Sequence, residues 1–288
     1  MKGIILAGGL GTRLYPSTKV ISKQLLNVYD KPMIYYPLSV LMLAGIKEIL
    51  IISSIIDLPS YKKLLGSGSD IGIQISYKEQ KNPGGLAEAF IIGEEFIDKS
   101  DVCLILGDNI FYGNNLFNLL NQAKNKCQTK SKAVIFSYKV NDPEAYGIVE
   151  IENNKIKSLE EKPKNPKSDL AIVGLYFYPN DVIKKATNIK PSKRGELEIT
   201  SINHEYFLEN RLEAQALGRG FSWFDTGTCE SLLIASNFIH IVEKRNCLKI
   251  ACLEEIALDM SFINKNDFKK IAKNYIDNDY GKYLNSIL

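Results

Sequence analysis

A glycine-rich loop near the start of the chain indicates phosphate chemistry. The apolar run from Ile4 to Ala7 is rich in β-branched residues and predicts a buried strand. Glycines follow it at positions 8, 9 and 11, and glycine permits the positive φ values with which backbone N–H groups converge on an anion. Arg13 and Lys23 lie close behind and could bind phosphate oxygens. An ordinary strand-to-helix turn with two surface cations would have the same glycines.

Two well-known nucleotide loops are excluded by the same residues. The segment from Gly9 to Leu14 begins like the dinucleotide fingerprint but has leucine where the third glycine belongs. Asp30 falls near the ribose-binding spacing, yet residues 20–24 do not form the strand that it should follow. No glycine-rich P-loop ending in Gly-Lys-Ser or Gly-Lys-Thr occurs. The loop would therefore be a third kind of phosphate site.

Two aspartates far apart in the sequence could hold a metal ion. Asp108 comes just past an apolar run at 102–106, and Asp225 follows Trp223-Phe224 in what we expect to be a tight turn. A hard divalent ion that bridges phosphates needs only one or two carboxylates, because water and phosphate oxygens supply its other ligands. Asx turns or helix caps would account for the same two residues.

Two further segments have the chemistry to bind a base and a sugar phosphate. Gln80 precedes a Pro-Gly-Gly turn that ends at Gly85, and an amide side chain that both donates and accepts can read a base edge. Glu161 and Lys162 follow an expected hairpin; a carboxylate can accept from two sugar hydroxyls, and an ammonium can bind phosphate. The alternatives are plain turn punctuation and a solvated charge run.

The elements that carry these residues alternate between strand and helix in the first half of the chain. We expect strands at 4–7, 48–53, 71–79, 102–106 and 133–140 and helices at 33–44, 87–96 and 116–127. This alternation predicts an α/β fold with a Rossmann-like, mostly parallel mixed sheet and helices on both faces. Ligands bind beyond the carboxyl ends of such strands, where the glycine loop and Asp108 would meet.

In the second half of the chain, the expected strands and helices no longer alternate regularly. Strands at 147–151 and 155–160 flank Asn153-Asn154, which predicts a hairpin. Further strands at 173–178 and 212–217 enclose a helix at 196–209, and helices follow at 230–244, 254–258, 266–274 and 279–284. We expect one core domain over 1–229, with a nucleotide-binding part to about 140 and a sugar-phosphate part over 141–229, and a helical tail over 230–288.

Composition excludes several other classes of protein. The 288 residues are 45% hydrophobic and 24% charged, as in a globular protein. The net charge of +3 is spread along the chain, so we expect no polymeric nucleic acid as partner. No apolar stretch reaches the roughly 18 residues of a membrane span, so we expect no membrane partner and a cytoplasmic location. Five cysteines without a C-x-x-C pair and two histidines predict reduced thiols and no histidine-based zinc site.

The chain resembles the sugar-1-phosphate nucleotidylyltransferases from end to end, and among them the thymidylyltransferases. The resemblance is carried by residues 8–18, 22–26, 30–37, 79–87 and 194–200. It implies that dTTP and glucose 1-phosphate are the substrates, that dTDP-glucose and pyrophosphate are the products, and that Mg²⁺ is the cofactor. The product would feed the synthesis of dTDP-L-rhamnose or related deoxysugars.

The resemblance also implies roles for individual residues. Arg13, Lys23 and Lys162 would be catalytic, and Asp108 and Asp225 would bind the metal. The nucleotide would be bound by Gly8, Gly9, Gly11, Thr12, Arg13, Gln24, Gln80, Gly85 and Asp108. The sugar phosphate would be bound by Asn109, Tyr146, Gly147, Glu161, Lys162, Val173 and Arg194.

For the tail, the resemblance implies a homotetramer with a regulatory nucleotide-sugar site. That site would include Arg219, Ala251, Glu255 and Ile256. The chain departs from the family at Leu258-Asp259, where relatives commonly have an aromatic residue and an arginine, so we expect weak inhibition by the end product. It also has Asn27 where proline is usual.

Three other functions remain open from the sequence. A uridylyl- or guanylyltransferase would share the fold and most of the motifs. A catalytically inactive sugar-nucleotide sensor is disfavoured because every charged residue that the chemistry needs is present. A nicotinamide-dependent oxidoreductase is disfavoured by the broken fingerprint.

Overall fold

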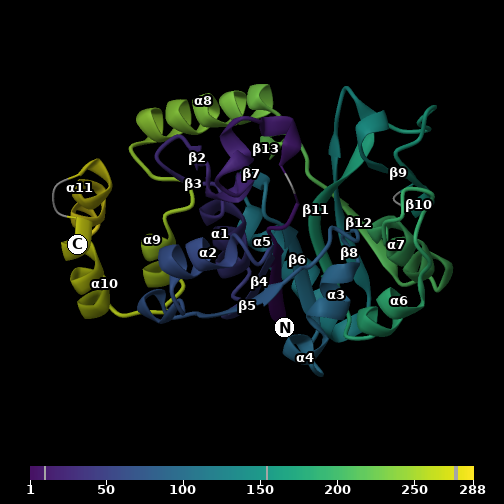
Figure 1. Cartoon of the computed structure of the whole chain (residues 1–288), viewed down its shortest axis with the longest axis horizontal. Coiled ribbons are helices and arrows are strands. Elements are labelled where there is room, and N and C mark those ends of the chain that lie inside the picture. Colours follow the sequence, from purple (N-terminus) through teal and green to yellow (C-terminus); the bar gives the residue numbers. More distant parts are fainter. Residues whose placement is uncertain (10, 154, 276–277) are drawn as a thin grey trace.

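A nine-stranded mixed sheet runs through the centre of the computed structural model, which describes residues 1–9, 11–153, 155–275 and 278–288 (Figure 1). Four neighbouring strands are parallel: β6 (Val102–Leu106), β1 (Lys2–Leu6), β4 (Glu48–Ser53) and β5 (Gln74–Glu79). Their central residues are apolar on both faces because helices cover both faces of a parallel sheet. This half of the sheet confirms the predicted α/β fold.

The other half of the sheet is mostly antiparallel and begins at the long strand β11 (Leu170–Tyr178), which pairs with β6. One end of β11 leads to the hairpin of β9 (Gly147–Glu152) and β10 (Lys155–Glu161). The strand also pairs with β8 (Ala133–Lys139), and β12 (Leu212–Ala216) lies parallel to β8. The predicted hairpin is confirmed, although Asn154 of its turn lies outside the described residues, as does Leu10 of the glycine loop.

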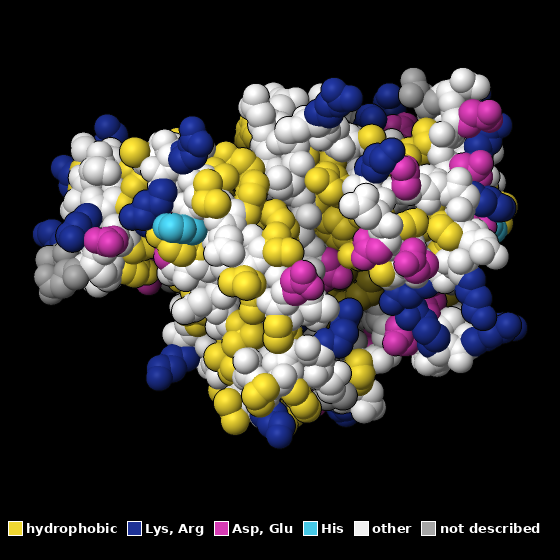
Figure 2. Space-filling view, turned by 90° about the horizontal axis from the view of Figure 1, so that it is seen from above, with side chains coloured by type: hydrophobic (Ala, Val, Ile, Leu, Met, Phe, Trp, Pro, Cys, Tyr) yellow, Lys and Arg dark blue, Asp and Glu magenta, His cyan; other side chains and the backbone are white. Residues whose placement is uncertain are grey.

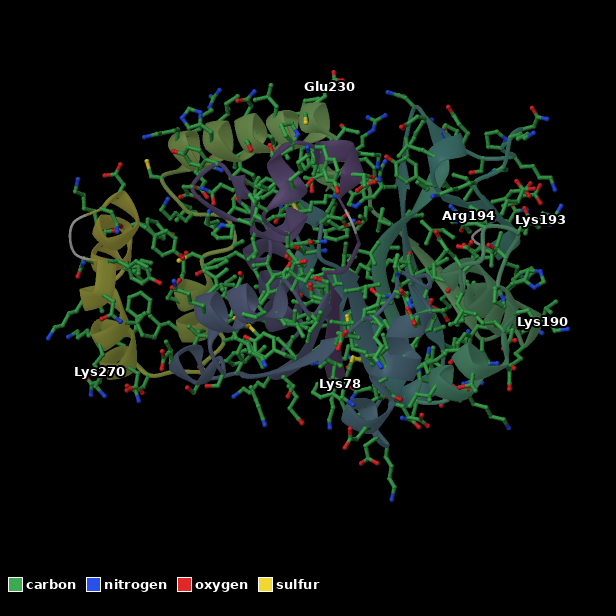
Figure 3. All side chains as sticks on the ribbon, in the orientation of Figure 1. Lys78, Lys190, Lys193, Arg194, Glu230 and Lys270 are labelled. Atoms are coloured by element: carbon green, nitrogen blue, oxygen red, sulfur yellow. The ribbon has the colours of Figure 1, made fainter. Side chains whose placement is uncertain are left out.

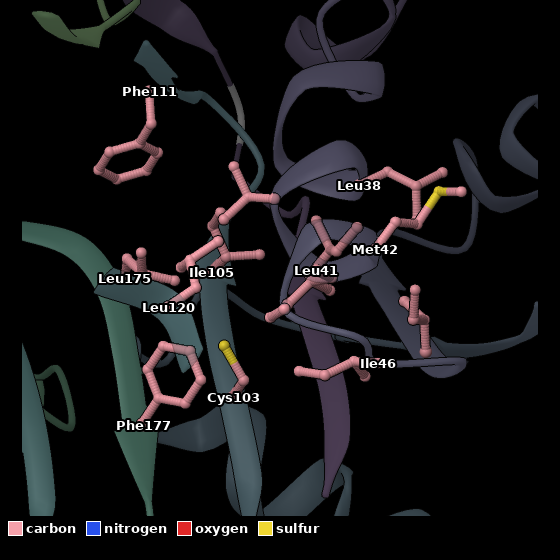
Figure 4. Packing of buried hydrophobic residues seen from close by; sticks show 14 of the residues in the cluster. Leu38, Leu41, Met42, Ile46, Cys103, Ile105, Phe111, Leu120, Leu175 and Phe177 are labelled. Carbon is pink, nitrogen blue, oxygen red and sulfur yellow. The ribbon is translucent and has the colours of Figure 1, made fainter. Parts of the chain in front are cut away.

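Two hydrophobic layers hold helices against the sheet. On one face, α1 (Tyr35–Leu43) and α5 (Leu116–Lys130) bury Leu38, Leu41 and Leu120 against Ile105 and Phe177 (Figure 4). The opposite face is covered by α3 (Glu88–Ile92), α6 (Val182–Asn188) and α7 (Ile199–Leu208). A single helix predicted over 87–96 is interrupted at Gly93, where α3 ends and α4 (Glu94–Ile97) begins. A β-carbon at Gly93 would press on Ile4, so the backbone approaches β1 closely here.

One helix and two small sheets near the parallel half were not predicted from the sequence. The helix α2 (Leu58–Leu65) follows β4 and is amphipathic. A second sheet pairs β7 (Asn109–Gly113) with β13 (Phe221–Asp225), and a third pairs β2 (Asn27–Val28) with β3 (Lys31–Pro32). The expectation of a tight turn at Asp225 is therefore wrong, because this residue ends a strand that pairs with β7.

The tail is helical, as predicted. The helix α8 (Cys229–Asn246) begins with a capping box between Thr228 and Ser231 and lies along the top of Figure 1. It is followed by α9 (Leu253–Asp259), α10 (Lys265–Ala272) and α11 (Asp279–Ser286), the last two forming a lobe at one side. Buried Glu243 of α8 accepts from Lys31 at 2.9 Å, which ties α8 to β3. Within the described ranges, no helix combines the length and apolarity of a membrane span.

Candidate active site

Lys23 and Asp108 meet at the carboxyl end of the parallel strands. Lys23 lies on a short 3-10 turn over 23–25 and is 9% exposed, and Asp108 connects β6 to β7. The Lys23 Nζ donates to Asp108 Oδ2 at 2.5 Å. The other carboxylate oxygen of Asp108 accepts from the Asn109 side chain at 3.0 Å. Two residues that lie 85 positions apart in the sequence are thus in direct contact.

The β7–β13 ladder brings Asp225 to the same place. Asp225 pairs with Asn109 in the register of this ladder. The next residue, Thr226, donates from both its backbone N–H and its hydroxyl to the Asp108 carbonyl, at 3.2 and 2.8 Å. The indole N–H of Trp223 donates to Asn109 Oδ1 at 2.7 Å. Both predicted metal-binding carboxylates therefore stand on one hydrogen-bonded framework.

The charge environment of Asp225 reflects this proximity. Burial and, after it, the negative charge of Asp108 raise the pKa of its carboxyl to about 6, although the charges of Lys23, Arg13 and Lys162 oppose the shift. All three predicted catalytic cations thus act on the same carboxylate from three different segments. A divalent cation between the two carboxylates would relieve their repulsion.

The glycine loop lies beside the two carboxylates and brings backbone groups and the Arg13 cation to them. Gly9 and Gly11 have φ values of 103° and 59°, which favour glycine, and Thr18 donates to the Gly11 carbonyl at 2.7 Å. Thr12 and Arg13 open a short 3-10 turn and are exposed. The Arg13 guanidinium lies against the backbone of Gly227, where a β-carbon would meet its Nη2 at 3.1 Å.

Gln80 lies beside the glycine loop. It directly follows β5 and is 8% exposed, and a β-carbon at Gly8 would collide with its Oε1. Its Nε2 donates to Glu88 Oε2 at 2.6 Å. Gly85 has a φ of 103° and packs so tightly on the Leu197 backbone that a β-carbon could not fit.

Gln24, another predicted nucleotide-binding residue, has a buried side chain. It is 4% exposed, and its Oε1 accepts from Ser22 at 2.9 Å and from the Tyr61 hydroxyl at 3.4 Å. A β-carbon at Gly107 would meet Gln24 Cγ at 3.0 Å. Its side chain therefore packs beneath the loop that carries Asp108.

A pocket of about 270 Å³ opens next to the two carboxylates. It is lined by Arg13, Asp108, Asn109, Tyr146, Gly147, Glu161, Lys162, Arg194 and Asp225, among others. Glu161 ends β10, and its two oxygens accept from Arg194 at 3.2 Å and from Thr200 at 2.5 Å. The predicted sugar-phosphate residues thus surround one cavity, with a carboxylate fixed in its wall.

Lys162 and Tyr146 are joined through the backbone at the edge of this pocket. The Lys162 N–H donates to the Tyr146 carbonyl at 3.0 Å, and Lys162 has a φ of 43°, which is uncommon for a residue with a side chain. The Tyr146 ring packs edge-on against Trp223, with 5.3 Å between the ring centroids. This packing connects the sugar-phosphate half to the strand that ends at Asp225.

Arg194 lies on the loop before α7 and is 41% exposed (Figure 3). It donates to both oxygens of Glu198 at 2.9 Å and to Glu161. Val173 differs from the other predicted residues, because its side chain is fully buried in the core while its neighbours Ile172 and Gly174 line the pocket. The alternation of side chains along a strand explains this, since successive residues face opposite sides.

Sequence reasoning missed several residues that shape the site. Thr200 holds Glu161, Glu198 holds Arg194, Glu88 holds Gln80, and Trp223 holds Asn109. Of these four residues, only Trp223 stands out in the sequence, because it is the one tryptophan of the chain. The other three lie in segments that read as ordinary helix starts.

The predicted regulatory residues do not share one cavity. Ala251 and Ile256 line a pocket of about 360 Å³ with residues 111–117 and parts of α1 and α8. Glu255 instead accepts from the Tyr283 hydroxyl at 2.7 Å, and Arg219 is exposed on the loop between β12 and β13. No cluster of three or more potential metal ligands of the His, Cys, Asp or Glu type occurs in the part of the chain that the structure describes.

Comparisons with known proteins identify relatives along the whole chain. A family model described as nucleotidyl transferase matches residues 2–241. A glucose-1-phosphate thymidylyltransferase of Neisseria meningitidis is 55% identical over 289 aligned positions, which cover 100% of this chain and 99% of the relative. One of Mycolicibacterium smegmatis is 50% identical with the same coverage of both chains.

Solved structures share the fold. A Bacillus anthracis protein described as a candidate glucose-1-phosphate thymidylyltransferase, in complex with sucrose, aligns with a TM-score of 0.76 at 40% identity, covering 83% of this chain and 94% of that one. A UDP-glucose pyrophosphorylase in complex with UDP-glucose aligns with a TM-score of 0.73 at 27% identity, covering 84% and 98%.

Proposed function

The chain belongs to the nucleotidyl transferase family, and on that premise we propose that it transfers a thymidylyl group from dTTP to α-D-glucose 1-phosphate. The products are dTDP-glucose and pyrophosphate. One observation carries the proposal: Asp108 and Asp225 share one electrostatic environment with Arg13, Lys23 and Lys162, beside a pocket of about 270 Å³.

The two substrates occupy opposite sides of the carboxylate pair. The triphosphate lies along the glycine loop, with the base beside Gln80 and Gly85, since these segments are adjacent. Glucose 1-phosphate enters the pocket, where Glu161 accepts from sugar hydroxyls and Lys162 binds the phosphate. Arg194 donates one hydrogen bond to Glu161 and helps to hold this carboxylate in place.

Mg²⁺ fits the residues present. Asp108 and Asp225 are held on one framework. Burial and, after it, the charge of Asp108 raise the pKa of Asp225, and a divalent cation held by both carboxylates would offset the repulsion between them. Asp108 and Asp225 would hold the ion, which would offset the negative charge of the phosphates. Lys23 donates to Asp108, so it keeps this carboxylate oriented.

The reaction is an in-line displacement. An oxygen of the sugar phosphate attacks the α-phosphorus, the new P–O bond forms as the bond to pyrophosphate breaks, and the electron pair leaves with pyrophosphate. The nucleophile is already ionised at neutral pH, so no general base is needed. Arg13 and Lys162 supply positive charge where negative charge builds up on the transferring group. The chain's main contribution is therefore positioning and electrostatic stabilisation.

We also propose that copies of the chain assemble through α8 into a homotetramer. Leu233, Ile234 and Ile241 on this helix are 61%, 51% and 56% exposed, and Figure 2, which looks down on α8, shows hydrophobic side chains spread over this face. Large apolar side chains clustered on one surface are typical of interfaces.

We expect end-product binding near Ala251 and Ile256 to be weak, because Leu258-Asp259 offers no cation for a phosphate.

A coupled assay of pyrophosphate release tests the proposal over a matrix of triphosphates and hexose 1-phosphates. We expect the highest kcat/KM for dTTP with glucose 1-phosphate. A uridylyltransferase is the second candidate, since a UDP-glucose pyrophosphorylase shares the fold. A large preference for UTP over dTTP would favour that candidate, and absence of pyrophosphate release with every pair would refute nucleotidyl transfer.

A further inference from the structure

A cavity of about 920 Å³ shares no lining residue with either pocket described above. It is lined by the start of α1, the end of α2, the loop over 66–71, and parts of α9 and α10. The end of this loop approaches the tail closely, since a β-carbon at Gly72 would collide with the Phe262 carbonyl. The cavity therefore lies where the parallel half of the fold meets the helical tail.

Glu254 gives the lining of this cavity a buried carboxylate. The residue lies on α9 and is 4% exposed. Its Oε1 accepts from the Tyr275 hydroxyl at 3.2 Å, and its Oε2 accepts from the Tyr280 hydroxyl at 2.6 Å. A carboxylate has about four acceptor positions, so these two donors leave others free. No lysine, arginine or histidine of the described ranges forms an ion pair with Glu254, and a buried charge without a partner is costly.

The charge of Glu254 acts on the two tyrosines that line the cavity with it. Burial and, after it, the charge of Glu254 raise the pKa of the Tyr35 hydroxyl to about 12. The same two causes raise the pKa of Tyr275. Among the described residues, no positive charge lowers the pKa of either hydroxyl. The negative potential in this wall is therefore not compensated from within the chain.

The charged residues of the lining leave an excess of negative charge. Its carboxylates are Asp70, Glu254 and Asp267, and its cations are Lys63 and Lys270. Lys270 donates to Asp267 at 3.0 Å, so these two charges offset each other. Asp70 is exposed and, like Glu254, forms no ion pair within the part of the chain that the structure describes. The cavity thus has one buried carboxylate and one surface carboxylate without a cation.

We propose that this cavity binds an aliphatic diamine or polyamine, with one ammonium group at Glu254 against the rings of Tyr35 and Tyr275 and another at Asp70. The faces of aromatic rings attract ammonium groups, and a carboxylate accepts charge-assisted hydrogen bonds from them. Hard metal ions need more oxygen ligands in one place, and no group of three potential metal ligands occurs among the described residues. The site is separate from the catalytic carboxylates, so the inference does not depend on the proposed reaction.

Isothermal titration calorimetry with putrescine, spermidine and the uncharged 1,4-butanediol tests the proposal. MgCl₂ is present throughout, because the catalytic carboxylates would otherwise attract the same amines. We expect wild type to bind both amines and not the diol. Glu254→Gln keeps the shape of the side chain and an acceptor for Tyr280 but removes the charge, so it should weaken amine binding at least about tenfold. Glu255→Gln is the matched control, since its carboxylate accepts from Tyr283 and does not line the cavity; its amine affinity should equal that of wild type.

Three results would overturn the inference. Wild type could bind no amine, or bind the diol as well as the diamine. Glu254→Gln could bind amines as tightly as wild type does. Binding could instead be lost in Asp225→Asn and kept in Glu254→Gln, which would place the amine at the catalytic carboxylates. If Glu254→Gln does not fold, the exposed substitution Asp70→Asn decides: putrescine should bind more weakly while the monoamine butylamine binds as before, and an unchanged putrescine affinity would refute the site.

Discussion

Replacing Asp225 with asparagine should make the protein more stable and less active. In the metal-free protein, burial and the charge of Asp108 raise the pKa of Asp225 from its ordinary value of 3.8 to about 6. An unfolded Asp225 ionises near its ordinary value, so between about pH 4 and pH 6 the folded protein binds the extra proton. Stability therefore falls as pH rises through this window.

The size of the effect follows from the same shift. A tenfold change in proton affinity corresponds to about 1.4 kcal/mol, so the full shift would be worth about 3 kcal/mol at neutral pH. Asp225 is partly exposed and the cations nearby can adjust, which lowers the expected gain to about 1–2 kcal/mol for Asp225→Asn at pH 7.5. The gain should shrink steadily as the pH is lowered below 6.

Urea unfolding in the presence of a chelator measures this at pH 7.5 and pH 5. The matched control is Asp169→Asn, which makes the same change on an exposed residue that pairs with Lys139. Adding Mg²⁺ should stabilise wild type and leave Asp225→Asn nearly unchanged, because only wild type keeps both carboxylates. A variant that is less stable than wild type at pH 7.5, or whose gain does not depend on pH, would refute the electrostatic account of the pair.

Three other substitutions test separate parts of the site and surface. Arg13→Ala should lower kcat at least about 100-fold without changing the Tm, since it removes a cation from the transferring phosphate; a variant that keeps more than about a tenth of wild-type kcat would contradict this role. Thr200→Val should raise the KM for glucose 1-phosphate about tenfold and leave that for dTTP unchanged, because Glu161 loses a donor; equal changes in both KM values would indicate general damage. Leu233→Asp should give smaller species in light scattering, whereas Leu208→Asp, on an equally exposed leucine of α7, should not; a monomeric wild type would rule out assembly through α8.

Much of the parallel half of the fold could be predicted because its signals are local. The strand at 48–53 and the strand at 102–106 have the same bounds in the sequence pattern and in the structure, since a strand buried on both faces is a continuous apolar run. The position of Asp108 just past the second of these strands followed directly. The glycines of the loop after β1 were evident from the sequence, but they did not by themselves distinguish a phosphate site from an ordinary strand-to-helix turn.

The contacts between distant segments could not be predicted from local signals. The pairing of β13 with β7, and the hydrogen bond from Trp223 to Asn109, join segments about 110 residues apart, and no local pattern indicates that these two segments are partners. For the same reason Asp225 was expected in a turn. Glu88 looked like the exposed first turn of a helix, and only the path of the chain brings it to Gln80.

The most direct test of nucleotidyl transfer is ³¹P NMR of a mixture of the purified protein, dTTP, α-D-glucose 1-phosphate and MgCl₂. The account predicts that the signal of glucose 1-phosphate disappears while the two coupled signals of a sugar diphosphate and one signal of free pyrophosphate grow in equal molar amounts. Addition of pyrophosphate to the product should reverse the change. Release of orthophosphate, or of pyrophosphate with glucose 1-phosphate left intact, would show hydrolysis of the triphosphate and contradict the account.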